Sequence, residues 1–129
     1  MPAASALKVL IVDDQLTIRS LVRAGLRDLG ITETREASDG EEALNSLVAS
    51  PSNLIISDYN MPKLDGLGLL MAVRKYPPTS KIAFIMLTGR ADRELVTRAS
   101  QYGVNNYLVK PFTVAVLRAK IEEVFGALT

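Results

Sequence analysis

A chain of 129 residues, 48% of them hydrophobic, can bury one core but is too short for two domains of ordinary size. The 15 Lys and Arg residues nearly balance the 14 Asp and Glu residues, and a net charge of +1 without a basic cluster argues against nucleic-acid binding. The chain contains no Cys and no His, which excludes disulfides, zinc–thiolate sites and hydrolase triads that need histidine. The remaining metal ligands, carboxylates and carbonyls, suit Mg²⁺, Ca²⁺ or Mn²⁺.

The sequence lacks the signals of export and membrane insertion. Its N-terminus has no charged start followed by an apolar secretory stretch, and no run approaches the roughly 20 apolar residues of a membrane span. We therefore expect a cytoplasmic protein with a single domain over residues 1–129 and no effector domain.

Apolar strand patterns alternate with helical patterns along the chain. Strands are predicted at 7–12, 31–37, 53–57, 82–87 and 107–109. Helices are predicted at 15–29, 40–49, 67–76, 91–102 and 114–128. Polar residues interrupt the second strand, which indicates a sheet edge, and Thr113 is a predicted N-cap of the last helix. The strict alternation predicts an α/β fold with a parallel sheet and helices on both of its faces.

Polar residues that can bind ligands or react stand at the ends of four predicted strands: Asp13, Asp14, Asp58, Thr88 and Lys110. In an open parallel sheet, the C-terminal ends of the strands line one crevice, and ligands bind there. Three carboxylates, a hydroxyl and an ammonium group would then converge. Together they predict a site for a hard cation and a phosphoryl group.

Several short motifs stand in order along the chain: the pair Asp13–Asp14, the segment 57–62 (SDYNMP), Asp65–Gly66, Thr88, Tyr107 and the segment 110–112 (KPF). With these motifs, residues 7–128 resemble the receiver domain of two-component response regulators, and within that family the CheY-like single-domain chemotaxis regulators. The resemblance implies a flavodoxin-like (CheY-like), doubly wound fold with five helices. Its five parallel strands would lie in the order 2-1-3-4-5.

The resemblance also implies the chemistry of the site. Asp58 would accept a phosphoryl group from the phosphohistidine of a sensor histidine kinase. Mg²⁺, for which Mn²⁺ can substitute, would be bound by Asp14, Asp58 and the carbonyl of Asn60, and Asp13 would hold coordinated water. Since the three carboxylates would repel one another without a metal, we expect at least one raised pKa among them. Lys110 would add positive charge to the phosphoryl oxygens, and the Lys110–Pro111 peptide would be cis.

The same resemblance implies a conformational switch. Drawing Thr88 toward the phosphoryl group would vacate space near Tyr107, which could then turn from exposed to buried. This movement would reshape a surface on the fourth helix, fifth strand and fifth helix, where a downstream protein such as the flagellar motor switch would bind. The residues expected on this partner surface are Ala91, Arg93, Val96, Tyr107, Val109 and Lys120. We expect the protein to act as a monomer.

Two positions depart from the pattern of the chemotaxis regulators. Tyr59 stands where a tryptophan commonly follows the phosphoacceptor, and Arg90 stands two residues after Thr88, where an acidic side chain is typical. We expect Asn60 and Arg90 to tune the rate of dephosphorylation. Our hypothesis is that the Arg90 guanidinium approaches the phosphoryl oxygens or hinders the attacking water, and so prolongs the aspartyl phosphate.

Other functions use a similar set of residues. A phosphorelay shuttle or a phosphate sink would need the same five side chains and would differ only in its partner. A haloacid-dehalogenase-like phosphatase also combines Asp, Thr, Lys and Mg²⁺, but it normally has a second acid where this chain has Asn60. An interaction module without phosphate chemistry has the same fold, although the five chemical positions are intact here. A flavodoxin-type cofactor binder is disfavoured because the first strand–helix turn is acidic.

Overall fold

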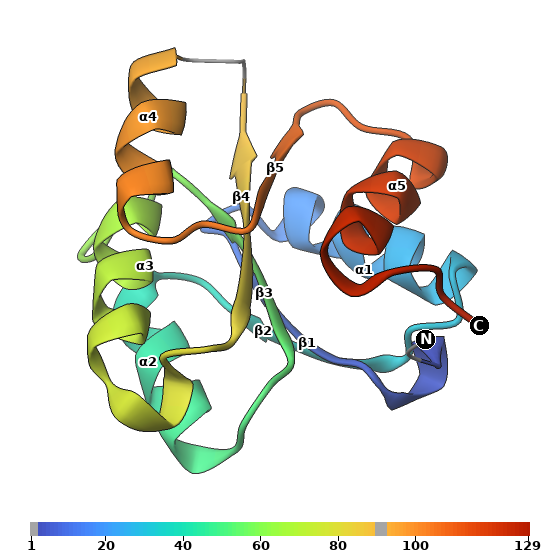
Figure 1. The fold of residues 1–129 in the computed structure, drawn as a ribbon, viewed down its shortest axis with the longest axis horizontal. Coiled ribbons are helices and arrows are strands. Elements are labelled where there is room, and N and C mark those ends of the chain that lie inside the picture. Colours follow the sequence, from blue (N-terminus) through green and yellow to red (C-terminus); the bar gives the residue numbers. More distant parts are fainter. Residues whose placement is uncertain (1–2, 90–92) are drawn as a thin grey trace.

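A parallel sheet forms the middle layer of the molecule (Figure 1). The computed structural model describes residues 3–89 and 93–129, and within these ranges the sheet has five strands in the order β2-β1-β3-β4-β5. The strands are β1 Lys8–Val12, β2 Glu33–Ala37, β3 Leu54–Asp58, β4 Ala83–Thr88 and β5 Asn106–Val109. The predicted fold class and strand order are thus confirmed.

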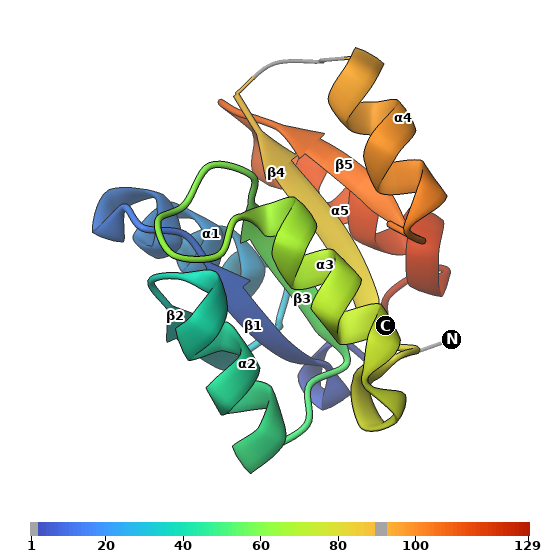
Figure 2. The same ribbon diagram turned by 90° about the vertical axis from the view of Figure 1, so that its left-hand side faces the viewer.

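Helices cover both faces of the sheet (Figures 1 and 2). On one face lie α1 Leu16–Asp28 and α5 Val114–Phe125. On the other face lie α2 Gly40–Ala49, α3 Gly66–Lys75 and α4 Arg93–Gln101. Two short 3₁₀ helices, η1 Ala4–Ala6 and η2 Pro77–Thr79, complete the described elements. Of the described helices, none has the length and apolar character that crossing a membrane requires.

The core consists of two hydrophobic clusters, one on each face of the sheet. Because side chains alternate along a strand, neighbouring residues of β1 enter different clusters: Val9 and Ile11 face α1 and α5, whereas Leu10 and Val12 face α2 and α3. Strands β3 and β4 are buried throughout, as expected for central strands of a parallel sheet. Strand β2 has one buried residue, Ala37, which confirms the predicted polar edge.

Hydrogen bonds at the helix starts explain where the helices begin. The carboxylates of Asp39 and Asp65 accept from backbone N–H groups in the first turns of α2 and α3, each at 2.8 Å. The Thr113 hydroxyl accepts from Val116 N at 3.1 Å, so the predicted N-cap of α5 is confirmed.

Some predicted boundaries were wrong by one to three residues. Asp58 and Thr88 are the last residues of β3 and β4 and do not follow these strands. Helix α5 ends at Phe125 because Gly126 takes a positive φ of 85°, which stops a helix. Leu128 therefore lies beyond the helix, although it is buried in the core as expected. The predicted residues 91 and 92 of the fourth helix lie outside the described residues.

Candidate functional site

The C-terminal ends of four strands meet at one edge of the sheet, at the top of Figure 1. Asp13 follows β1, Asp58 ends β3, Thr88 ends β4 and Lys110 follows β5. The register places Asp58 opposite Leu87, the residue before Thr88. The Lys110 N–H donates to the Thr88 carbonyl at 2.7 Å, which extends the β4–β5 pairing by one residue. The predicted convergence at this edge is therefore present in the structure.

Three carboxylates form the acidic part of the site. One oxygen each from Asp13, Asp14 and Asp58 lies within 4.8 Å of the other two. Asp13 and Asp58 are buried, while Asp14 is exposed, so the group is open to solvent on one side. Three negative charges at this spacing repel one another and favour a bound cation.

The Lys110 ammonium group partly balances this charge. Its Nζ lies 3.0 Å from Asp58 Oδ1 and 3.7 Å from Asp13 Oδ2. The Lys110–Pro111 peptide bond is cis, as expected. Lys110 thus connects the two buried carboxylates to the β5–α5 segment.

The surroundings of Asp13 oppose the negative charge of its carboxylate. Burial raises its pKa from 3.8 to about 6, against the lowering effect of the hydrogen bond from Gln15 N to Asp13 Oδ1 at 2.8 Å. The negative charge of Asp58 raises the pKa further, so repulsion contributes as expected but is weaker than burial. Asp13 Oδ2 is buried and, within the described residues, has no hydrogen-bond partner. A buried oxygen of an acidic group that has no hydrogen bond fits a divalent cation or a water molecule bound to it.

Backbone contacts hold the two loops that carry the carboxylates. The Arg19 guanidinium donates to the Asp13 carbonyl at 2.7 Å and to Glu36 Oε1 at 3.0 Å, which ties the β1–α1 turn to the end of β2.

In the loop between β3 and α3, Gly66 N–H donates to the Tyr59 carbonyl at 2.8 Å. A Cβ at Gly66 would overlap the Asp58 carbonyl oxygen, which explains why glycine follows Asp65 in this motif. Asn60 lies in this β3–α3 loop and is exposed.

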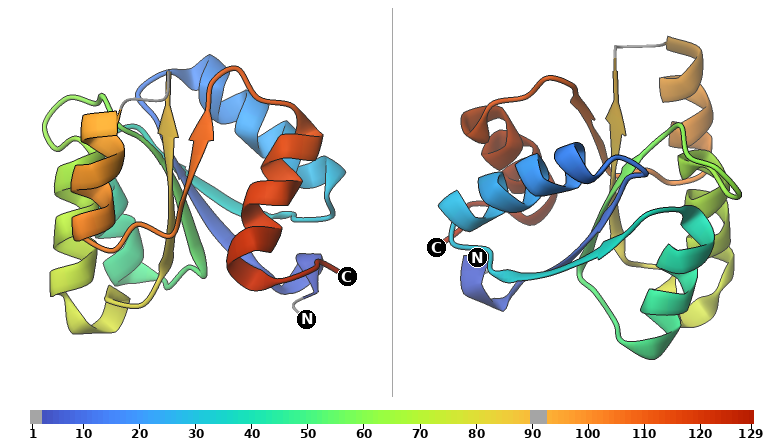
Figure 3. Two further views of the ribbon diagram at one scale, coloured as in Figure 1. Left: turned by 45° about the horizontal axis from the view of Figure 1, so that its top comes forward. Right: turned by 180° about the vertical axis from the view of Figure 1, so that it is seen from behind.

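The predicted partner surface lies where β5 stands between α4 and α5 (Figure 3, left view). Val96, Tyr107 and Lys120 are half-buried there, and Val109 is exposed. Arg93 begins α4. Arg90 and Ala91 lie outside the described residues, so the hypothesis about Arg90 stays a prediction.

Tyr107 is placed differently from the expected exposed resting position. It is half-buried, because its hydroxyl reaches α4 and hydrogen-bonds the carbonyl of Val96 at 2.7 Å and the hydroxyl of Ser100 at 2.6 Å. The sequence did not predict these contacts, because they depend on how α4 packs beside β5.

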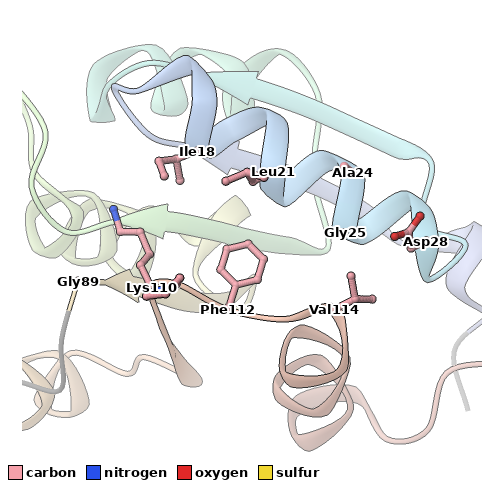
Figure 4. Close-up of a pocket in the computed structure, with 10 residues that line it drawn as sticks. Ile18, Leu21, Ala24, Gly25, Asp28, Gly89, Lys110, Phe112 and Val114 are labelled. Atoms are coloured by element: carbon pink, nitrogen blue, oxygen red, sulfur yellow. The ribbon is translucent and has the colours of Figure 1, made fainter.

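An apolar groove that the sequence did not predict adjoins the acidic group. It has a volume of about 460 Å³ and lies between α1 and the β5–α5 segment. Figure 4 shows Ile18 and Leu21 of α1 facing Phe112, with Lys110 at one end and Asp28 at the other. Its lining is mainly apolar, and Lys110 belongs to both this groove and the acidic site. The sequence has no separate signal for the groove, because Leu21 shares the helical spacing of Ile18 and Val22, and only the structure shows that it is 60% exposed.

Comparisons with known proteins agree with this geometry. Residues 9–122 match the family model of the response regulator receiver domain. The chain is 52% identical over 128 residues to a probable chemotaxis protein CheY of Rhizobium etli, and the match covers 99% of each protein. It is 44% identical to the chemotaxis protein CheY of Pseudomonas aeruginosa, covering 92% of this chain and 96% of that protein.

Solved structures give the same result. The high-resolution structure of the Vibrio cholerae chemotaxis protein CheY4 superimposes with a TM-score of 0.85 at 35% sequence identity, covering 96% of this chain and 99% of that one. The chain therefore belongs to the response regulator receiver domain family, as its motifs predicted. It is a signalling protein of the CheY-like type, and this membership disfavours the dehalogenase-like phosphatase.

Proposed function

We propose that the protein is a phosphorylation-switched response regulator in chemotaxis signalling, with Asp58 as its phosphoacceptor. One observation carries the proposal: Asp58 is buried at a strand end, within 4.8 Å of two other carboxylates and 3.0 Å from the Lys110 ammonium group. The names of the Rhizobium and Pseudomonas relatives support the chemotaxis role. We further propose that the protein acts in the cytoplasm as a monomer. The match over 99% of the Rhizobium protein supports one receiver domain over residues 1–129.

The acidic group fits Mg²⁺, with Mn²⁺ as a substitute. Asp14, Asp58 and the carbonyl of Asn60 would ligate the cation. Asp13 Oδ2, which has no hydrogen-bond partner among the described residues, would hold a coordinated water. The cation supplies positive charge to phosphoryl oxygens, which become more negative as the group is transferred.

The chain's own residues orient the transfer. The Asp58 carboxylate would attack the phosphorus of a phosphohistidine on the kinase, forming an O–P bond as the P–N bond breaks and the imidazole leaves. Lys110 already lies 3.0 Å from Asp58 and would move its hydrogen bond to a phosphoryl oxygen. The Thr88 hydroxyl, at the end of the neighbouring strand, would bind another of these oxygens. Autophosphorylation from small donors and later loss of the phosphate would use the same residues.

Phosphorylation would be read at the partner surface. Movement of Thr88 would change the position of Tyr107 on the neighbouring strand, and a downstream protein would bind the changed face. In chemotaxis this target would be the flagellar motor switch.

The apolar groove supports a route for the phosphodonor. Because Lys110 lines both the groove and the acidic site, a protein that presents phosphohistidine to Asp58 would pass over α1. Exposed apolar residues such as Leu16 and Leu21 would then be covered by the histidine-bearing domain of the kinase.

Intact-protein mass after incubation with acetyl phosphate tests the proposal. We expect one phosphoryl adduct on the native chain that requires Mg²⁺ and is absent from Asp58→Asn. Asp28→Asn, which removes an exposed carboxylate at the end of α1, is the matched control and should retain the adduct. The absence of any adduct on the native protein, together with unchanged spectra in beryllofluoride, would instead support an interaction module without phosphate chemistry.

A further inference from the structure

Two hydrogen bonds attach the Tyr107 side chain to α4. The Tyr107 hydroxyl donates to the Val96 carbonyl at 2.7 Å, and it lies 2.6 Å from Ser100 Oγ. A phenol has one hydrogen, and the carbonyl can only accept, so Ser100 must donate to the tyrosine oxygen. The donor and one acceptor position of the phenol are therefore both in use.

The two partners lie together on α4. Val96 and Ser100 are four residues apart, which places them on the same side of a helix, one turn from each other. Ser100 is exposed, yet its hydroxyl reaches the tyrosine on the adjacent strand. We call this pair of contacts the α4 clasp.

The clasp acts on the residue that the proposed switch moves. Tyr107 pairs with Met86 in the β4–β5 register, and Thr88 lies two residues further along β4. Since side chains alternate along a strand, Met86 and Thr88 face the same side of the sheet, and this is the side on which Tyr107 packs. A response of Tyr107 to Thr88 requires a new side-chain rotamer, which carries the phenol oxygen away from α4 and breaks both hydrogen bonds.

From this geometry we infer that Ser100 is a positioning residue that holds Tyr107 in the unphosphorylated conformation and so opposes switching. The inference rests on the proposed function for the existence of the switch, but the hydrogen bonds that carry it are independent of phosphate chemistry. Ser100 is not a catalytic residue, because it acts only through Tyr107.

Replacing Ser100 changes the clasp without harming the helix. Ser100→Ala removes one of the two hydrogen bonds, and because alanine is the better helix former, the variant should still fold with stability close to that of the native protein. Losing one net hydrogen bond of about 1 kcal/mol shifts the Tyr107 equilibrium about fivefold toward the released rotamer. By linkage, the variant should bind beryllofluoride about fivefold more tightly in the presence of Mg²⁺. Ser100→Thr keeps the hydroxyl and should restore native behaviour.

Fluorine NMR of protein labelled with 3-fluorotyrosine measures the effect directly. The chain has 4 tyrosines, and the Tyr107 signal is the one that disappears in Tyr107→Phe. We expect Ser100→Ala to move this signal toward its position in the beryllofluoride complex, while Ser100→Thr leaves it in place. Ser80→Ala removes the hydroxyl of a half-buried serine, which donates to the Pro77 carbonyl, and is the control that should not move it.

The outcomes separate this inference from the proposed function. A Tyr107 signal that is identical in the native protein and Ser100→Ala, with unchanged beryllofluoride affinity, would overturn the clasp. If Ser100→Ala releases Tyr107 but beryllofluoride has no effect on any variant, the clasp exists and the phosphorylation switch does not. A weaker affinity for beryllofluoride in Ser100→Ala would also overturn the inference, because the clasp would then favour the switched state.

Discussion

Asp13 is a buried carboxylate whose ionisation lowers the free energy of unfolding. Its side chain is buried beside two other carboxylates, one of its oxygens has no hydrogen-bond partner among the described residues, and its pKa is raised to about 6. Well below pH 3.8 the group is protonated in both the folded and the unfolded chain, so it does not make the free energy of unfolding depend on pH. Between pH 3.8 and about 6 the unfolded chain releases the proton first, and the free energy of unfolding therefore falls as the pH rises.

We expect the metal-free protein to lose on the order of 2 to 3 kcal/mol of stability across this pH range through Asp13. Thermal unfolding in EDTA from pH 4 to 7 measures the loss. Asp13→Asn should remove this part of the pH dependence and be more stable than the native protein at pH 7. Adding Mg²⁺ at pH 7 should stabilise the native protein more than the variant. If the stability of the native protein changes between pH 4 and 7 in the same way as that of Asp13→Asn, the expectation is wrong.

At the scale of elements, the start of α2 fixes the loop that follows β3. Gly40 N–H donates to the Leu64 carbonyl at 3.2 Å, and Lys63 Nζ lies 3.7 Å from the Asp39 carboxylate. A Cβ at Gly40 would lie 2.5 Å from the Leu64 carbonyl oxygen and 2.7 Å from Leu64 Cβ, both closer than real contacts allow. The β3–α3 loop, which carries Asn60, therefore depends on glycine at the first position of α2.

Gly40→Ala should push this loop away from α2. Overpacking of this kind destabilises by about 1 to 3 kcal/mol. We also expect weaker Mg²⁺ binding by calorimetry, because the displaced loop contains the carbonyl of Asn60. The matched control for stability is Gly89→Ala, where an added Cβ meets nothing within 4 Å. If both variants have the same melting temperature as the native protein, the contact between Gly40 and Leu64 does not position the loop.

The sequence could predict the features that follow from the burial of the strands. Runs such as those of β3 and β4 are apolar because both faces of a central parallel strand are buried, so their pattern reveals the strands and places Asp58 and Thr88 at one edge. The approach of Lys110 to Asp58 follows from that topology. The hydroxyl contacts of Tyr107 with α4 depend on how a helix packs beside a strand, and no periodic pattern encodes them.

In the whole molecule, the two proposed binding surfaces lie in different places. The proposed partner surface lies at the β5 edge between α4 and α5, while the apolar groove lies between α1 and the β5–α5 segment. Lys110 stands between the two, because it follows β5, pairs with Asp58 and lines the groove. Under the proposed function, this separation would allow the protein to receive phosphate on one side and to bind its target on another.

A charge placed in the groove should separate protein donors from small donors. Leu21 is 60% exposed, so Leu21→Glu should fold normally, yet it would bury an unpaired carboxylate under any protein that covers α1. We expect phosphotransfer from the phosphorylated kinase to slow by at least tenfold, since burying a charge without a partner costs more than about 1.4 kcal/mol. Labelling of Asp58 by acetyl phosphate should be unchanged, because a small donor needs only the acidic group and Lys110. Val48→Glu is the matched control, since Val48 is 68% exposed on α2, on the opposite face of the sheet. Equal rates of kinase transfer to both variants would show that the donor approaches Asp58 from another side.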